Sequence, residues 1–512
     1  MVQRLLLVLV LFAAPLAARA QEKAAPPRVD VVLWFDTEDY LLPADDDACK
    51  RLAELLTRRG IRATFKVVGE KARVLEKRGR ADVIAAMRGH DIAYHSNLHS
   101  VHPTPAEYLA DAGLLDGVAE FVRREGPGAA DVRRVFGVDS LSCYGQPGSS
   151  WASQAIAALG PIGVRANGGV PCYVDSGNHV GLGGRPFWYA GALVVYNMKP
   201  NETRFDLHVP QALAVGKRNV TEIAERLRGE GGGLISIFYH PCEWVHKEFW
   251  DGVNFSRGAN PPRGEWKVPA QRSAEETHAA FERFASYVDH IKGLPGVRFV
   301  TARELPDRYP DRIRAAGATK DDLTEIALRA TAEDSPGLDF ITTRAGSYSP
   351  ADQFELLVEA VTAAADGAPI DFPLPAKGLL GPDAPPPAGG ELGAIAWPAF
   401  VAAARDARDF VRTQRRVPSR VFVGADPVPP ADFLVALGRT WRAHATDGRL
   451  PVDRDVRLGR GTELLTARHI ARDTPNLFGG WVIHKENFRA PGILEIARLQ
   501  AWTLKPARPA VP

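Results

Sequence analysis

The stretch Val31-Val32-Leu33-Trp34-Phe35-Asp36-Thr37-Glu38-Asp39 joins an apolar run to three carboxylates within four residues. Residues 29–35 predict a buried β-strand, because β-branched and aromatic side chains dominate them. If the strand continues, Asp36 and Glu38 point to the same side; if the chain turns after Asp36, Asp39 can rejoin that side. One carboxylate could then bind a metal ion while another acts as base on water. A solvated acidic turn is the alternative.

Strand-like and helical segments alternate from residue 29 to about residue 300. The predicted strands are residues 29–35, 63–68, 92–94, 132–138, 234–239 and 297–300, and the predicted helices are 47–59, 82–87, 106–124, 150–159, 221–228 and 274–291. Such alternation favours parallel strands with helices outside them, in a barrel or an open α/β sheet. Chemistry in these folds collects at the carboxyl ends of strands, where Asp36, His95 and His240 are expected.

The stretch His95-Ser96-Asn97-Leu98-His99 offers two imidazoles four residues apart. The spacing alone is weak evidence, because one helical turn brings any side chains i and i+4 to one face. Two histidines and one carboxylate suit Zn²⁺ or a similar divalent ion and leave positions for water and substrate. With the acids upstream, the pair predicts metal-assisted hydrolysis. His102 is expected beside the ligands rather than among them.

A histidine also ends the apolar strand Ile237-Phe238-Tyr239-His240. It could be the general acid that protonates a leaving amine or alcohol, and a buried structural histidine is the alternative. Aromatic residues are plentiful between the motifs, and flat rings suit sugar faces, although large aromatics are more often core. Trp244, just past His240, is the aromatic residue that we expect to contact substrate.

The length of 512 residues predicts two or three domains. Residues 1–20 have the pattern of a signal peptide, with Arg4 before a short apolar core and Ala18-Arg19-Ala20 at the cleavage site, so an exported, periplasmic or secreted protein is expected. Residues 21–28 are expected to be a linker, 29–308 the catalytic domain, and 309–512 a smaller, mostly helical module. Two Pro-Ala-Asp helix starts, at residues 350–352 and 430–432, suggest two weak repeats there.

The composition excludes several classes of protein. A formal net charge of +2 provides no basic field for nucleic acid, and no apolar run after the signal peptide is long enough to span a bilayer. Four cysteines are too few for a disulfide scaffold, and they lack the C-x-x-C spacing of a structural zinc site. Their pairing is left open, with three combinations possible.

Five stretches over about residues 29–305 resemble, in order, the motifs of the polysaccharide deacetylase (NodB-homology) family. They are Phe35–Asp39 for the strand-ending Asp motif, Gly60-Ile61-Arg62-Ala63-Thr64-Phe65-Lys66-Val67-Val68-Gly69 for the second strand, His95–His99 for the H-S/T-x-x-H metal motif, Gly145-Gln146-Pro147-Gly148 at the R-x-P position, and Ile237–His240 for the L-x-x-H motif. The resemblance implies a deformed (β/α) barrel and a divalent metal, usually zinc. It also implies removal of acetyl groups from an N-acetylated, peptidoglycan- or chitin-like glycan.

The resemblance also implies roles for individual residues. Asp36 would be the general base and His240 the general acid. His95 and His99 would bind the metal together with Asp39 or Glu38. Gln146, Pro147 and Gly148 would contact the acetylated polysaccharide, with a backbone N–H near Gly148 holding the oxyanion; Trp244 is added to these contacts on its aromatic ring alone.

Two departures from the family pattern leave alternatives open. The family's Asp-Asp pair is stretched to Asp-Thr-Glu-Asp, so the acidic ligand is ambiguous. Gly145 occupies the position of the arginine that normally orients the base, so Arg165 or Arg134 would have to replace that arginine. An O-acetyl esterase, a non-sugar amidase and a non-catalytic glycan-binding protein are therefore the alternatives to a deacetylase.

Overall fold

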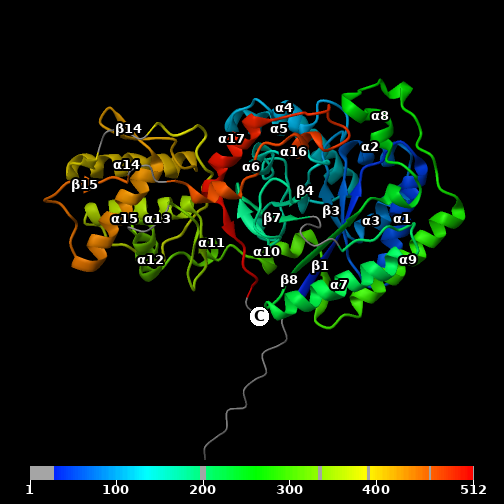
Figure 1. Cartoon of the computed structure of the whole chain (residues 1–512), viewed down its shortest axis with the longest axis horizontal. Coiled ribbons are helices and arrows are strands. Elements are labelled where there is room, and N and C mark those ends of the chain that lie inside the picture. The colour runs from blue at the N-terminus through cyan, green and yellow to red at the C-terminus, as the bar shows by residue number, and fades with distance from the viewer. Residues whose placement is uncertain (1–27, 197–202, 333–336, 389–392, 460–462, 511–512) are drawn as a thin grey trace, which may run out of the picture.

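The computed structural model describes residues 28–196, 203–332, 337–388, 393–459 and 463–510. The predicted signal peptide and most of the predicted linker lie outside these residues, so export stays a prediction. A sheet wrapped by helices forms one side of the molecule, and a smaller helical group forms the other (Figure 1). Among the described helices, none has the length and apolar character needed to cross a membrane.

The centre of the fold is a ten-stranded, mostly parallel sheet with the order β16-β6-β7-β5-β4-β3-β2-β1-β8, in which β9 also pairs with β1. The strands are β1 (Val29–Thr37), β2 (Thr64–Val67), β3 (Asp91–Tyr94), β4 (Cys143–Gly145), β5 (Cys172–Asp175), β6 (Phe187–Tyr189), β7 (Ala192–Tyr196), β8 (Gly233–Tyr239), β9 (Val297–Val300) and β16 (Lys505–Pro506). In this described sheet, only the β6–β7 and β16–β6 pairs are antiparallel. The sheet is curled and open (Figure 1), and the predicted fold class, a deformed barrel of alternating strands and helices, is confirmed.

Strand β1 runs through the middle of the sheet and is buried over its whole length. Leu33 and Phe35 pack in the outer core beneath the helices, whereas Val32 and Trp34 pack inside the curl. This alternation follows from the pleat of the strand. It turns Asp36 to the same side as Trp34, at the carboxyl end of the strand.

Helices cover the outer face of the sheet. They include α1 (Pro43–Thr57), α2 (Gly69–Lys77), α3 (Ala81–Arg88), α5 (Leu114–Phe136), α7 (Ala212–Gly229) and α9 (Ala274–Lys292). Each turns an apolar face to the core, as Leu52 of α1 and Phe284 of α9 illustrate; both are fully buried. Burial of one such side chain stabilises the fold by about 1.5–3 kcal/mol, and the sum holds the strand ends in a fixed arrangement.

The predicted strand at residues 132–138 is wrong. Residues 114–136 form one helix, α5, which continues through Pro127. The run Gly126-Pro127-Gly128 and the β-branched residues after it favour a break and a strand locally. Val132 and Phe136 are nevertheless completely buried in the outer core, and this packing outweighs the local propensity.

The C-terminal part holds a second hydrophobic cluster, built mainly on α12 (Lys320–Ala330), α13 (Pro350–Ala365), α14 (Trp397–Gln414) and α15 (Pro430–Asp447). The two Pro-Ala-Asp stretches begin α13 and α15, which pack against each other. The chain then returns to the sheet, where Phe478 and Leu494 join the first core and β16 pairs with β6. Residues 309–512 are therefore not one separate module, because their last part completes the first core.

All four cysteines are buried thiols, and none of them forms a disulfide. Cys143 and Cys172 are direct neighbours in the register of β4 and β5. Burial raises the pKa of each thiol above its usual range. The cysteines therefore act as small apolar core residues.

Glu355 in α13 makes the stability of the second cluster depend on pH. Its carboxylate accepts a hydrogen bond from the backbone of Lys377 at 3.0 Å and lies 3.5 Å from Arg415, yet burial raises its pKa from 4.5 to about 7. The folded state holds this proton more tightly than the unfolded state, so the stabilisation is present below pH 4.5 and is lost as pH rises through about 7.

We expect Glu355→Gln to be more stable than the natural protein at pH 8 by roughly 1–3 kcal/mol, and to show little difference at low pH. Thermal unfolding followed at pH 4.5 and pH 8 checks this. Glu325→Gln, at a half-exposed ion pair of α12, is the control. An equal shift of melting temperature at both pH values would contradict the assignment.

Candidate metal centre and active site

Three segments meet at the carboxyl edge of the sheet, as the strand pattern predicts. Asp36 lies at the end of β1 and Glu38 just beyond it, His95 follows β3, and His240 follows β8. The carboxyl ends of parallel strands share one edge. Segments far apart in the sequence therefore bring their polar side chains together at this edge.

Glu38, His95 and His99 form a compact group of possible metal ligands, whose donor atoms all lie within 4.8 Å of one another. Oε2 of Glu38 lies 2.9 Å from Nε2 of His99 and 3.6 Å from Nε2 of His95. All three side chains are buried. Two imidazole nitrogens and one carboxylate oxygen suit Zn²⁺.

Hydrogen bonds at the far side of each ring orient the two imidazoles. Nδ1 of His95 lies 2.8 Å from the carbonyl oxygen of Gly145, which can only accept, so Nδ1 carries the proton. Nδ1 of His99 lies 2.6 Å from Oγ of Ser100, which in turn donates to Asp251 at 3.1 Å. In the neutral rings both Nε2 lone pairs are therefore free to bind a metal, and a carbonyl and a carboxylate fix the rings from behind.

The two histidines lie on a loop and not on a helical turn. Ser96 and His99 adopt left-handed conformations, with φ of 67° and 58°. Ser96 Oγ accepts from the backbone N–H of His99 at 3.1 Å, and Glu125 of α5 accepts from that of Asn97 at 2.7 Å. A Cβ at Gly128 would lie 2.6 Å from Asn97 Oδ1, so only glycine lets α5 pass this loop. Surrounding contacts thus hold a strained backbone, as is common at functional sites.

Lys66 is the cation that pairs with Asp36. Its Nζ lies 2.6 Å from Oδ1 of Asp36, and both side chains are buried. The two residues are direct neighbours in the register of β1 and β2. Burial alone would raise the pKa of Asp36, but the charges of Lys66, His95 and His240 outweigh it and leave the pKa below its usual range.

Gly145 makes room for this lysine. A Cβ at Gly145 would lie 2.7 Å from Cδ and Nζ of Lys66, so a side chain at position 145 and the lysine compete for one space. Arg134 and Arg165 make their contacts at the surface instead. Lys66 therefore takes the place of the absent arginine. It stands in the second-strand run of the sequence, but only the strand register shows that it meets Asp36.

His240 faces the same carboxylates from the other side. Its Nε2 lies 3.7 Å from Asp36 and 3.9 Å from Glu38, and its Nδ1 lies 2.9 Å from Oε1 of Glu243. Burial would lower the pKa of His240, but Glu38, Glu243 and Asp36 raise it to about 9. Arg204 pairs with Glu243 and so holds this acid in place. The arrangement keeps the imidazole of His240 protonated at neutral pH.

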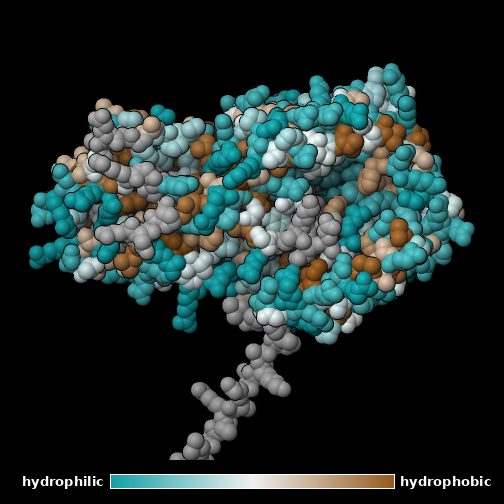
Figure 2. Space-filling model, viewed as in Figure 1, coloured by the Kyte–Doolittle hydropathy of each residue, from teal (hydrophilic) through white to brown (hydrophobic). Residues whose placement is uncertain are grey.

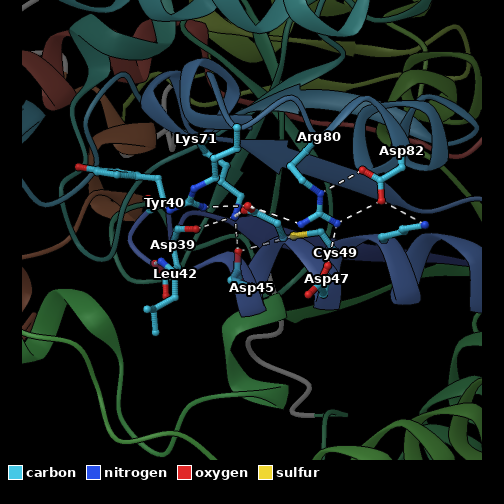
Figure 3. Close-up of polar contacts among 12 residues, drawn as sticks. Asp39, Tyr40, Leu42, Asp45, Asp47, Cys49, Lys71, Arg80 and Asp82 are labelled. Atoms are coloured by element: carbon cyan, nitrogen blue, oxygen red, sulfur yellow. Dashed lines mark hydrogen bonds and ion pairs between the residues drawn. The ribbon is translucent and has the colours of Figure 1, made fainter. Parts of the chain in front are cut away.

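Asp39 points away from the ligand group. Its Oδ2 lies 3.1 Å from Nδ1 of His246, and its backbone carbonyl accepts a hydrogen bond from Lys71 at 2.6 Å. Figure 3 shows Asp39 beside the buried network of Lys71 and Asp45. Of the two acids left open by the sequence, Glu38 is the one beside the histidines. His102 also lies apart from them and bonds to a glutamate of α4 (Pro105–Leu109).

A cavity of about 470 Å³ opens over these residues. Of the predicted substrate residues, Gln146 and Gly148 line it, whereas Pro147 is not among its lining residues. Trp244 does not reach it: the side chain is fully buried and packs against the rings of Phe35 and Phe284. The prediction that Trp244 contacts substrate is therefore wrong, because the short helix after His240 turns this indole back into the core.

Further residues line the cavity that the sequence analysis did not single out as site residues. Phe249 packs edge-on against His240, with ring centroids 4.9 Å apart, and Asp251 supports His99. Another part of the wall comes from the C-terminal part of the chain, through Asn476, Gly480, Trp481 and Val482. No sequence motif marks these four C-terminal residues. They lie more than 300 positions after His99, and the sequence alone does not indicate that the chain returns to the sheet edge there.

No protein-family model matches the chain, and no curated protein has a detectably similar sequence. Similar solved structures include polysaccharide deacetylases and carbohydrate esterases of family CE4. A proposed polysaccharide deacetylase from Mycobacterium smegmatis is 15% identical, over 56% of this chain and 93% of that one, with a TM-score of 0.34. A Streptococcus mutans CE4 esterase is 14% identical, over 54% and 86%, with a TM-score of 0.31. A CE4 family pseudoenzyme from Bacillus anthracis is 10% identical, over 54% and 65%, with a TM-score of 0.27.

Proposed function

We propose that this chain is a metal-dependent hydrolase that removes acetyl groups from an N-acetylated glycan. The observation that carries the proposal is the buried group of Glu38, His95 and His99 beside the Lys66-paired carboxylate of Asp36, at the floor of an open cavity. The order of the sequence motifs supports the same reaction. An exported location, expected from residues 1–20, suits a glycan substrate.

Glu38, His95 and His99 would hold the metal, and zinc is the ion that this donor set suits best. When bound, such an ion supplies Lewis-acid polarisation of a carbonyl and lowers the pKa of water. The residues fit this task because both Nε2 atoms face the carboxylate of Glu38, while hydrogen bonds at Nδ1 hold the two rings in place. All three side chains are buried and line one cavity, from which water and substrate can reach them.

Asp36 is the base in this proposal. Lys66 keeps its carboxylate ionised, with a lowered pKa, so that it can accept a proton from the attacking water. His240 lies on the other side, 3.7 Å from Asp36, and Glu243, 2.9 Å from its Nδ1, favours the protonated imidazole that can give a proton to the leaving nitrogen. One carboxylate and one imidazolium thus have opposite protonation states at neutral pH, which general base and general acid catalysis requires.

The experiment that tests the proposal measures acetate release by the zinc-loaded protein. N-acetylglucosamine oligomers, acetylated xylan and small acetyl esters are compared. We expect release from the amino-sugar oligomers, and we expect chelation of the metal to abolish it. Release from the esters alone would show that the bond hydrolysed is an O-acetyl ester and not an amide. Release from none of these substrates by the metal-loaded protein would refute the proposal of a deacetylase.

A further inference from the structure

Part of the cavity wall is built by Asn476, Gly480, Trp481 and Val482, far after the metal-binding loop in the sequence. The half-buried indole of Trp481 stands edge-on to His99, with ring centroids 5.8 Å apart and planes at 88°. Its ring atoms lie 2.3 Å from the place where a Cβ of Gly148 would be. Glycine at 148, with φ of 47°, is therefore what admits the indole to the edge of the cavity.

Several contacts fix this segment. Ser149 donates a hydrogen bond to the carbonyl oxygen of Phe478 at 2.8 Å, and Thr104 lies 2.9 Å from Nε2 of His484. Backbone N–H groups of Arg257 and Gly258 donate to the carbonyl oxygens of Val482 and Ile483, each at 2.8 Å. Phe478 and Ile483 are completely buried on either side of Trp481. The indole is thus presented on a rigid support, and binding a ligand would not require ordering it first.

Two aromatic rings lie beside the polar residues of the cavity, one next to a metal ligand and one next to the proposed general acid. Trp481 lies beside His99, and Phe249, which is 40% exposed, lies beside His240. Val482 next to the indole is 53% exposed. Aromatic side chains commonly line ligand cavities, and a flat ring fits the C–H face of a pyranose.

We propose that Trp481 is a substrate-binding residue that stacks on the sugar ring bearing the acetyl group, on the His99 side of the cavity. This inference rests on the proposed function and names the C-terminal segment as part of the substrate site. Residues 476–482 would then serve recognition, while the strand-end residues perform the chemistry. A substrate without a sugar ring would not use this contact.

Binding measured by calorimetry tests the inference, with the zinc-loaded full chain and N-acetylglucosamine tetramer as the probe. Trp481→Ala is expected to weaken binding by at least about tenfold, equal to about 1.4 kcal/mol. Trp481→Phe keeps a flat ring and should stay within about threefold of the natural protein, equal to about 0.7 kcal/mol. Trp481→Leu fills the space beside Gly148 without a flat face and should behave like the alanine variant.

Trp397→Ala is the matched control, since Trp397 is also half-buried but packs against Phe400 in the second cluster. Unchanged binding by both Trp481→Ala and Trp481→Leu, with acetate release by the natural protein intact, would overturn the inference and leave the proposed function standing. Restoration by leucine would assign Trp481 a packing role and overturn it too. If the natural protein neither binds the tetramer nor releases acetate, both proposals are refuted.

Discussion

Asp36→Asn is expected to lower the rate of acetate release by about 10³-fold or more while the protein still binds zinc. The amide keeps the shape of the side chain but cannot take a proton from water, and general base catalysis contributes about 10²–10⁴-fold. Asp36 is held in place by the charge of Lys66, whose Nζ lies 2.6 Å from Oδ1 of Asp36, and it is not one of the three residues of the ligand group. Steady-state kinetics together with metal analysis of the purified variant measure the effect.

The matched control is Asp39→Asn, because this acid comes from the same tetrapeptide but lies against His246. We expect it to release acetate at a rate near that of the natural protein. If Asp36→Asn retained full activity, or if Asp39→Asn lost as much as Asp36→Asn, the assignment of the base would be wrong.

Lys66→Ala is the second change with a large expected effect, a fall in kcat of about 10²-fold. Loss of one partner of a buried ion pair leaves the other charge unpaired, which typically costs about 3–5 kcal/mol. Here the unpaired group is Asp36, whose pKa would rise and whose carboxylate would lose its fixed position. KM is expected to change little, since Lys66 is not among the residues that line the cavity.

A second substitution separates positioning from simple loss of stability. Position 145 faces the space of Lys66, and its backbone is not in the left-handed region, so it tolerates a side chain once the lysine is shortened. We expect Lys66→Ala with Gly145→Arg to recover at least about tenfold of the lost kcat, or about 1.4 kcal/mol. Gly145→Arg alone should impair the protein, because arginine and lysine then compete for one space. No recovery in a folded double variant would contradict the role given to Lys66.

Part of the central sheet could be predicted from local patterns, namely β1, β2, β3, β8 and β9, whereas β4 to β7 and β16 were not predicted. Strand β1 and the strand-ending positions of Asp36, His95 and His240 follow from apolar runs that each end in a polar side chain. Parallel strands share a carboxyl edge, so these three residues had to meet. The one wrong strand, at residues 132–138, lies where Pro127 and its glycines break the helical pattern, while burial of Val132 and Phe136 keeps the helix intact.

Contacts between distant segments could not be predicted in the same way. The choice of Glu38 over Asp39 depends on how the chain leaves β1, and the partner of Asp36 depends on the register between β1 and β2. The positions of Trp244 and Trp481 could not be predicted for a similar reason. Composition marks both as large aromatic rings, and only the path of the chain puts one in the core and the other at the cavity.

The surface also limits what sequence can tell. The face shown in Figure 2 is mostly hydrophilic, with hydrophobic residues in small separate groups. A surface of this kind does not by itself mark a site. The buried ligand group and the cavity above it are therefore the features that mark the site in this protein.

Zinc binding measured by titration calorimetry, on the natural protein and on Glu38→Gln and Asp39→Asn, tests the central claim most directly. We expect one zinc ion per chain, an affinity at least about 100-fold lower for Glu38→Gln, equal to about 2.7 kcal/mol, and an affinity close to that of the natural protein for Asp39→Asn. A natural protein that binds no divalent metal, or an affinity lost in Asp39→Asn and kept in Glu38→Gln, would contradict it.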